Sequence, residues 1–245
     1  VQALLDSQAD VVVLDARRFD EYQTMSITTG ISVPGAELVL RARELAPDPA
    51  TRIIVNCAGR TRSIIGTQSL INAGVANPVS ALRNGTIGWT LAGQKLAHGQ
   101  SRRFAPTSEE HREVAAADAR RVADKARVGR ASLADLQGWQ QEANRTTYLF
   151  DVRTPEEFEA GHLPGARSTP GGQLVQETDH VASVRGARLV LADDDGVRAN
   201  MSASWLAQLG WEVHVLDGLQ PAQFSEKGAW VAPVPAPPQA ELITP

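Results

Sequence analysis

The sequence predicts an α/β protein made of two copies of one domain, and three observations support this prediction. A short apolar run followed by Asp-x-Arg occurs at residues 12–17 and again at residues 148–153, so that Asp15 and Asp151 stand 136 residues apart. Apolar runs of strand length alternate with segments of helical periodicity in both halves of the chain. The length of 245 residues also suits two domains of ordinary size.

The predicted elements of the first copy alternate between strand and helix. Mostly apolar runs bounded by turn residues predict strands at residues 11–14, 53–56 and 79–82. Residues 63–73 carry apolar side chains near helical spacing, and Gly74 is the expected stop of this helix. Such continuous apolar runs suit strands that are buried on both faces of a parallel sheet.

The second copy repeats this order. Strands are predicted at residues 189–192 and 213–216, and a helix is predicted at residues 201–209 with Gly210 after it. Alternating strands and helices predict an open sheet with helices on its faces and right-handed crossovers. Ligands of such sheets bind beyond the carboxyl ends of the strands. The single cysteine, Cys57, directly follows a strand and is therefore expected at that edge.

The chain divides into four predicted segments. They are a first domain at residues 1–105, a helical linker at 106–127, a second domain at 128–233 and a Pro-rich tail at 234–245. The linker is rich in Ala, Glu, Arg and Asp, which predicts a helix with a solvated, charged face. The sequence begins within a domain pattern, so we expect a longer native chain with a further domain after the tail.

Composition argues against several classes of function. The net charge of −4 offers no basic surface to a nucleic-acid backbone. No apolar run approaches the roughly 20 residues of a membrane span. A single cysteine leaves no internal disulfide and no thiolate metal cluster, and we expect neither a metal nor an organic cofactor. One free thiol suits a reducing compartment, which favours the cytoplasm.

The loop from Cys57 to Ser63 has the features of a thiolate site. Gly59 permits a tight turn in which successive backbone N–H groups point inward as an anion-binding nest. Ser63 is expected to cap the next helix, whose positive dipole end faces the sulfur. Arg60 and Arg62 add positive charge, and all three influences favour the nucleophilic thiolate. The predicted catalytic residue is Cys57, and the predicted substrate-binding residues are Ala58, Gly59, Arg60, Thr61, Arg62 and Ser63.

Several motifs together resemble the rhodanese superfamily of sulfurtransferases. They are the Cys57 loop, the Asp-x-Arg strand ends, the Gly-His-Leu-Pro-Gly-Ala stretch at residues 161–166, and Asn84-Gly85 followed by Gly88-Trp89. The resemblance covers nearly the whole chain except the linker and the tail. It implies two tandem rhodanese-like domains, each a mostly parallel five-stranded sheet flanked by helices.

The resemblance also implies a two-step reaction. The Cys57 thiolate would attack the outer sulfur of a donor such as thiosulfate, displacing sulfite and leaving a persulfide. A thiophilic acceptor such as cyanide or a thiol would then remove that sulfur. By the same resemblance, the backbone N–H groups of residues 58–63 hold the sulfur, while Arg60 and Arg62 meet the oxyanion of the donor. The implied partners are these small molecules, with contact between the two repeats or with further rhodanese-like domains.

Other residues of these motifs favour a structural interpretation. Asp15 and Arg17 lie at a strand end, but they recur as Asp151 and Arg153 in the copy that lacks a cysteine. By resemblance, His162 is a packing residue near a turn. The first copy has no histidine near its loop in sequence, so activation of the thiol is expected from charge and backbone amides.

The second copy has lost the nucleophile. The 136-residue offset places Asp193 opposite Cys57, followed by Asp194 and Asp195, whereas Arg198 matches Arg62. Three carboxylates would repel an anionic donor and oppose a thiolate. Clustered carboxylates can bind a hard cation, but the remaining ligands of a cage are not evident. We expect an inactive loop with a scaffold or interface role.

Two other functions remain open. A cysteine-dependent phosphatase would use the same thiolate, amides and arginine, but its signature places the arginine six residues after the cysteine. Ser63 occupies that position here, and Arg62 comes one residue early. The phosphatase branch of the family also has a longer loop, able to surround a phosphate. The second alternative is a non-catalytic sulfur carrier or interaction module, which the degenerate copy favours and the intact Cys57 loop disfavours.

Overall fold

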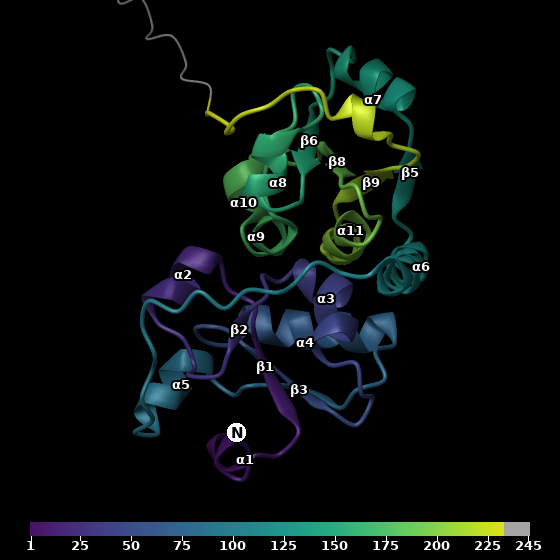
Figure 1. Ribbon diagram of the computed structural model, residues 1–245. Coiled ribbons are helices and arrows are strands. Elements are labelled where there is room, and N and C mark those ends of the chain that lie inside the picture. Colours follow the sequence, from purple (N-terminus) through teal and green to yellow (C-terminus); the bar gives the residue numbers. More distant parts are fainter. Residues whose placement is uncertain (233–245) are drawn as a thin grey trace, which may run out of the picture.

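The computed structural model describes residues 1–232, which form two parallel sheets with helices on their faces (Figure 1). The α/β class and the tandem arrangement are therefore as predicted. The predicted Pro-rich tail at 234–245 lies outside the described residues. Within residues 1–232, no helix combines the length and the apolar character needed to span a membrane.

The first sheet has the strand order β2-β1-β3-β4, and all of its pairs are parallel. Its strands are β1 (Val11–Asp15), β2 (Ile31–Ser32), β3 (Arg52–Asn56) and β4 (Val79–Ala81). Its helices are α1 (Gln2–Asp6), α2 (Phe19–Thr24), α3 (Glu37–Leu45), α4 (Thr61–Ala73) and α5 (Gly85–Leu91). Strands β1 and β3 pair from Val11 to Asp15, so both end at the edge where Cys57 follows. Helix α4 ends before Gly74, which takes the left-handed conformation expected of a stop.

The second sheet has the order β5-β9-β8-β6-β7, again with all pairs parallel. Its strands are β5 (Gly129–Ala131), β6 (Thr147–Asp151), β7 (Arg167–Ser168), β8 (Arg188–Ala192) and β9 (Glu212–Leu216). Its helices are α7 (Leu133–Gln140), α8 (Pro155–Ala160), α9 (Gly171–Gln176), α10 (Thr178–Val181) and α11 (Arg198–Gln208), followed by the 3₁₀ turn η1 (Pro221–Gln223). The strands that correspond to β1, β2 and β3 keep the 136-residue offset.

The first sheet differs from the prediction in its number of strands. Five strands were expected in each sheet, but the first has four among the described residues. The additional strand of the second sheet is β5, which pairs with β9 at the edge. The difference therefore lies at one edge and leaves the strands around Cys57 unchanged.

The linker forms helix α6 (Glu109–Lys125), which begins after the capping residue Ser108. Most of its charged side chains are exposed, whereas Ala115, Ala119 and Ala123 on one face are fully buried, which the sequence pattern did not predict. Their small side chains let α6 pack against α3, α4 and α11 at once. The linker therefore joins the two repeats through packing and not only through the chain.

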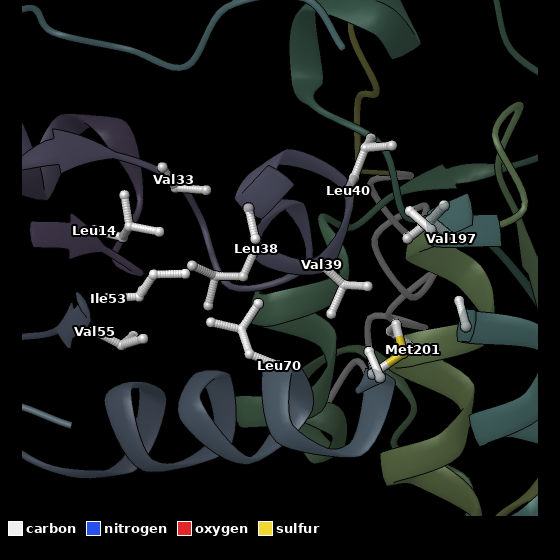
Figure 2. Close-up of a cluster of buried hydrophobic side chains, with 14 of the residues drawn as sticks. Leu14, Val33, Leu38, Val39, Leu40, Ile53, Val55, Leu70, Val197 and Met201 are labelled. Carbon is white, nitrogen blue, oxygen red and sulfur yellow. The ribbon is translucent and has the colours of Figure 1, made fainter. Parts of the chain in front are cut away.

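The two repeats share a hydrophobic core. Leu38 of α3 lies between the sheet residues Leu14 and Ile53 and Leu70 of α4, and the same buried cluster continues to Val197 and Met201 of the second repeat (Figure 2). Val197 directly precedes α11 and belongs to the loop that contains Asp193. Burial of apolar surface therefore fixes the loop of the second repeat against the first repeat.

Candidate active site

Cys57 lies between β3 and α4, with α5 packed against the carbonyl side of its loop. The backbone N–H of Thr86 donates to the Cys57 carbonyl at 2.9 Å, and the N–H of Ile87 donates to the Ala58 carbonyl at 3.1 Å. These bonds satisfy donors at the start of α5. They also turn the first two carbonyls of the loop toward α5.

Gly85 makes this contact possible. Its φ of 53° lies in the left-handed region, and an added Cβ would lie 2.0 Å from the Cys57 carbonyl oxygen. No other residue type allows the backbones to approach so closely. The Asn84-Gly85 pair belonged to the sequence motif, but its role in supporting the Cys57 loop depends on the tertiary contact.

The amides of the loop have no protein acceptor. Within residues 1–232, none of the backbone N–H groups of residues 58–63 donates a hydrogen bond to a carbonyl or a side chain. Several of them form the unsatisfied first turn of α4, a helix of 13 residues. Unpaired amides at a helix start form a site for an anion. Of the predicted substrate-binding residues, Ala58, Gly59 and Thr61 have such amides without an acceptor in the described chain.

Ser63 contacts the sulfur but does not cap the helix. Helix α4 begins at Thr61, two residues earlier than predicted, and Arg60 is the capping position, without a side-chain cap. Ser63 is instead the third helical residue. The Cys57 thiol donates to its Oγ at 3.3 Å, and this hydroxyl donates to the Arg60 carbonyl at 3.0 Å. Cys57 itself is buried, with 2% of its surface exposed.

The two predicted arginines have different surroundings. Arg60 is exposed and forms no ion pair among the described residues. Arg62 is half-buried, and its two Nη atoms bind both carboxylate oxygens of Glu21 on α2, at 2.5 and 2.8 Å. Hydrogen bonding between the two groups raises the pKa of Arg62 and lowers the pKa of Glu21. Sequence reasoning missed Glu21, although its recurrence as Glu157 at the 136-residue offset was a usable signal.

Arg62 also borders a cleft between the repeats. This cleft has a volume of about 590 Å³ and is lined by residues of both repeats at the carboxyl edges of their sheets. The backbones of Gly35 and Gly172 also meet, since an added Cβ at Gly172 would lie 3.1 Å from Gly35 Cα. Of residues 57–63, Arg62 alone is among the residues that line this cleft.

The loop of the second repeat is filled by its own carboxylates. Asp193, which stands at the position of Cys57, accepts hydrogen bonds from the amides of Gly196 and Ala199 at 3.1 and 2.8 Å. Burial, followed by the charge of Asp195, raises the pKa of Asp193 well above its usual range. Among the described residues, no group of three or more His, Cys, Asp or Glu side chains is arranged to hold a metal ion.

One known protein family matches both repeats of the chain. The family described as Rhodanese-like domain matches residues 1–92 and 132–218, which together make up more than half of the chain. The chain belongs to the rhodanese-like domain family. Each match contains one of the two loops, the one with Cys57 and the one with Asp193.

Relatives of this rhodanese-like chain are known in three bacteria. A solved thiosulfate sulfurtransferase from Pseudomonas aeruginosa is 76% identical, with a TM-score of 0.95, and the match covers 99% of this chain and 46% of that one. The uncharacterized protein YqhL of Bacillus subtilis is 36% identical over 75 residues, 30% of this chain and 58% of the relative. The HTH-type transcriptional regulator Rv0324 of Mycobacterium tuberculosis is 42% identical over 62 residues, 22% of this chain and 27% of the relative. The chain thus spans less than two thirds of each relative.

The Asp-x-Arg pairs of both rhodanese-like repeats are structural. Arg17 binds both carboxylate oxygens of Asp15 and the Met25 carbonyl, and Asn56 also donates to Asp15. Arg153 binds Asp151 in the same way. His162 stacks on the Phe158 ring with a centroid distance of 3.7 Å, which agrees with a packing role. These groups fix the strand ends beside each loop.

Proposed function

We propose that this chain is a sulfurtransferase, and that Cys57 of the first repeat carries sulfur from a donor such as thiosulfate to a thiophilic acceptor. The observation that supports this most is the run of amides at residues 58–63, which have no acceptor among residues 1–232 and directly follow a cysteine at a helix start. The catalytic unit would be the domain at residues 1–105. It would need neither metal nor organic cofactor.

In the first step, the Cys57 thiolate attacks the outer sulfur of thiosulfate. A new S–S bond forms, the S–S bond of thiosulfate breaks, and sulfite leaves with the electron pair of that bond. The terminal sulfur of the resulting persulfide is an anion at the pH of the cell. The loop amides stabilise it because their N–H dipoles are already oriented and need no reorganisation.

In the second step, an acceptor such as cyanide attacks the terminal sulfur. The S–S bond of the persulfide breaks, thiocyanate leaves, and the Cys57 thiolate is restored. A thiol acceptor would leave as a persulfide by the same displacement. When the thiol is ionised, the Ser63 hydroxyl, 3.3 Å from the Cys57 sulfur, would turn from the Arg60 carbonyl and donate to the thiolate.

Similarity supports the same assignment. The relative from Pseudomonas aeruginosa that is 76% identical carries the name thiosulfate sulfurtransferase. The second repeat, in which Asp193 replaces the cysteine, would take no part in the chemistry. A single free thiol suits a reducing compartment, so we place the protein in the cytoplasm.

The phosphatase alternative is weaker. The arginine closest to the position required by the phosphatase signature is Arg62, whose two Nη atoms are held by Glu21. A loop with Ser63 at the sixth position after the cysteine offers no arginine there. Hydrolysis of p-nitrophenyl phosphate at a rate that depends on Cys57 would favour this alternative over sulfur transfer.

The deciding experiment is thiosulfate:cyanide turnover by the wild type and by Cys57→Ser. We expect at least about a 1000-fold loss of thiocyanate formation, because the nucleophile is removed. Asp193→Ala is the matched control and should retain the wild-type rate within about twofold. Mass spectrometry after thiosulfate alone should find one added sulfur atom on the Cys57 peptide and an equal amount of sulfite. No adduct and no sulfite would favour a non-catalytic module.

A further inference from the structure

The degenerate loop contains carboxyl side chains that accept hydrogen bonds from its own backbone amides. Residues 193–199 correspond in sequence position to residues 57–63 at the 136-residue offset. Their backbones differ at one point, because Gly196 has a φ of 70° and its counterpart Arg60 a φ of −133°. In the second repeat, the carboxylate of Asp193 accepts from the amides of Gly196 and Ala199. The corresponding amides of the first repeat belong to Arg60 and Ser63. Asp193 thus shows that two amides of this loop can bind acceptor atoms attached to the residue at the position of Cys57.

A second carboxylate marks a separate position in the same loop. Asp195 accepts from the amides of Val197 and Arg198 at 2.7 and 3.1 Å. Its other oxygen accepts from the Nε of Arg198 at 2.6 Å. The corresponding groups of the first repeat are the amides of Thr61 and Arg62 and the Nε of Arg62. The residue opposite Asp195 is Gly59, which has no side chain.

The arginine in both loops is held by the same kind of partner. The Nη atoms of Arg198 bind both oxygens of Glu157 on α8, as those of Arg62 bind both oxygens of Glu21 on α2. With its Nη atoms on Glu157, Arg198 still has its Nε for Asp195. In the first repeat, the Nε of Arg62 has no acceptor within residues 1–232.

We infer that Glu21 is a positioning residue of the Cys57 site: it holds both Nη atoms of Arg62 so that the Nε faces a subsite for the oxyanion of the sulfur donor. This subsite consists of the Arg62 Nε and the amides of Thr61 and Arg62. The amides of Arg60 and Ser63 are left for the sulfur on Cys57. The inference rests on the proposed function and adds to it where each half of the donor binds.

The proposed subsite uses a part of Arg62 that remains free while Glu21 holds its two Nη atoms. A guanidinium has five N–H donors, and a bidentate carboxylate uses two of them. The remaining Nε–H has a fixed direction because both Nη atoms are fixed. Donors oriented in advance bind an anion without loss of side-chain entropy on binding. The sulfonate end of thiosulfate has the charge and the acceptor oxygens that this subsite needs.

The first test introduces a carboxylate into the proposed subsite by substituting Gly59, a residue of the Cys57 loop. An added Cβ at Gly59 meets no atom within 4 Å, so Gly59→Asp should fold and place a carboxylate where Asp195 places one. We expect the KM for thiosulfate to rise at least about tenfold, whereas the neutral Gly59→Asn should raise it less than about threefold. Equal effects of Asp and Asn would overturn the subsite.

A second readout of this variant does not depend on sulfur transfer. Iodoacetate and iodoacetamide both alkylate the Cys57 thiolate, so the ratio of their rates cancels the thiolate fraction and reports binding of an anion beside the sulfur. Gly59→Asp should lower the iodoacetate-to-iodoacetamide ratio at least about fivefold relative to Gly59→Asn. An unchanged ratio contradicts the subsite even if the wild type does not turn over thiosulfate. Absence of thiosulfate turnover by the wild type, together with the predicted ratio, would instead contradict the proposed function and leave the subsite supported.

The second test separates positioning from simple charge. Glu21→Gln removes a negative charge near the site, so electrostatics alone would lower the KM for thiosulfate. If Glu21 positions Arg62, the KM should instead rise about tenfold, with kcat changed less than about threefold, because the Nε loses its direction. Glu157→Gln, the same change in the second repeat, should leave the KM unchanged. A fall in the KM of Glu21→Gln, or no change, would overturn the inference.

Discussion

The loops after β3 and β8 correspond in sequence position, but they differ in what accepts hydrogen bonds from their backbone amides. In the first, the amides of residues 58–63 have no acceptor in the described chain, and Cys57 lies beneath them. In the second, Asp193 and Asp195 accept four amide hydrogen bonds. The loop that lacks the cysteine therefore satisfies these amides with its own carboxyl groups. Unpaired buried donors cost stability, so the unpaired amides of the first loop agree with its proposed role in binding an anion.

Arg62 and Arg198, which occupy corresponding positions in the two loops, also differ in their burial and in their ion-pair partners. Arg62 has one carboxylate partner, Glu21, and borders the cleft between the repeats. Arg198 is 1% exposed and binds Glu157, Asp194, Asp195 and, across the repeat boundary, Glu37 of α3 at 2.8 Å. Although burial opposes its charge, these carboxylates raise the pKa of Arg198 well above its usual range. The degenerate loop has thus become part of the interface between the repeats.

The largest expected effect comes from removing the buried arginine. Arg198→Met should lower the free energy of unfolding by about 3–5 kcal/mol, because Glu37 and its neighbouring carboxylates lose their counter-charge. Arg62→Met should lower it by only about 1 kcal/mol, since its one partner reaches solvent. Urea denaturation followed by circular dichroism measures both. Equal losses would mean that the two loops do not differ in their structural role.

A smaller effect is expected from the glycine that supports the Cys57 loop. Gly85→Ala should lower the free energy of unfolding by about 2–3 kcal/mol and reduce thiosulfate turnover, because its Cβ would overlap the Cys57 carbonyl. Gly218 also has a positive φ, but an added Cβ there meets no atom within 4 Å. Gly218→Ala should therefore cost only about 1 kcal/mol and leave turnover unchanged. Normal turnover in Gly85→Ala would mean that the contact between α5 and the Cys57 loop is not needed for thiosulfate turnover.

The smallest expected effect is a dependence of stability on pH that originates in the second loop. The raised pKa of Asp193 means that the folded state holds its proton more tightly than the unfolded state. Stability is therefore gained as pH falls through the folded pKa and is complete below the unfolded value. Burial would raise the pKa of Glu157, but its bonds to Arg198 prevail and lower it to about 2, so Glu157 stays ionised above pH 5.

The measurement compares the wild type with Asp193→Asn between about pH 8 and pH 5. The free energy of unfolding of the wild type should rise relative to the variant by about 1 kcal/mol or more as the pH falls. Other carboxylates titrate alike in both proteins, so the difference reports Asp193. A constant difference across this range would contradict a buried, proton-holding aspartate at the position of the cysteine.

Patterns within short stretches of sequence determined most of the fold. The apolar runs, the Asp-x-Arg repeats and Gly74 predicted the α/β class, the two tandem units and the end of α4, because these depend on neighbouring residues. The Cys57 loop was also evident from its own residues. Ser63 was the exception: α4 begins two residues earlier than the pattern indicated, so this residue falls inside α4 and its hydroxyl contacts the sulfur.

Contacts between distant segments decided the rest. Glu21 and Arg62 are 41 residues apart, and Glu37 and Arg198 are 161 apart, so no local pattern connects them. The burial of the alanine face of α6 and the support of Cys57 by α5 likewise arise only when helices pack. Secondary structure follows from local preferences, whereas the ion-pair partner of a charged side chain depends on which segments of the chain meet in the folded structure. The sequence alone determined where the thiol stands, and the tertiary structure decided which groups surround it.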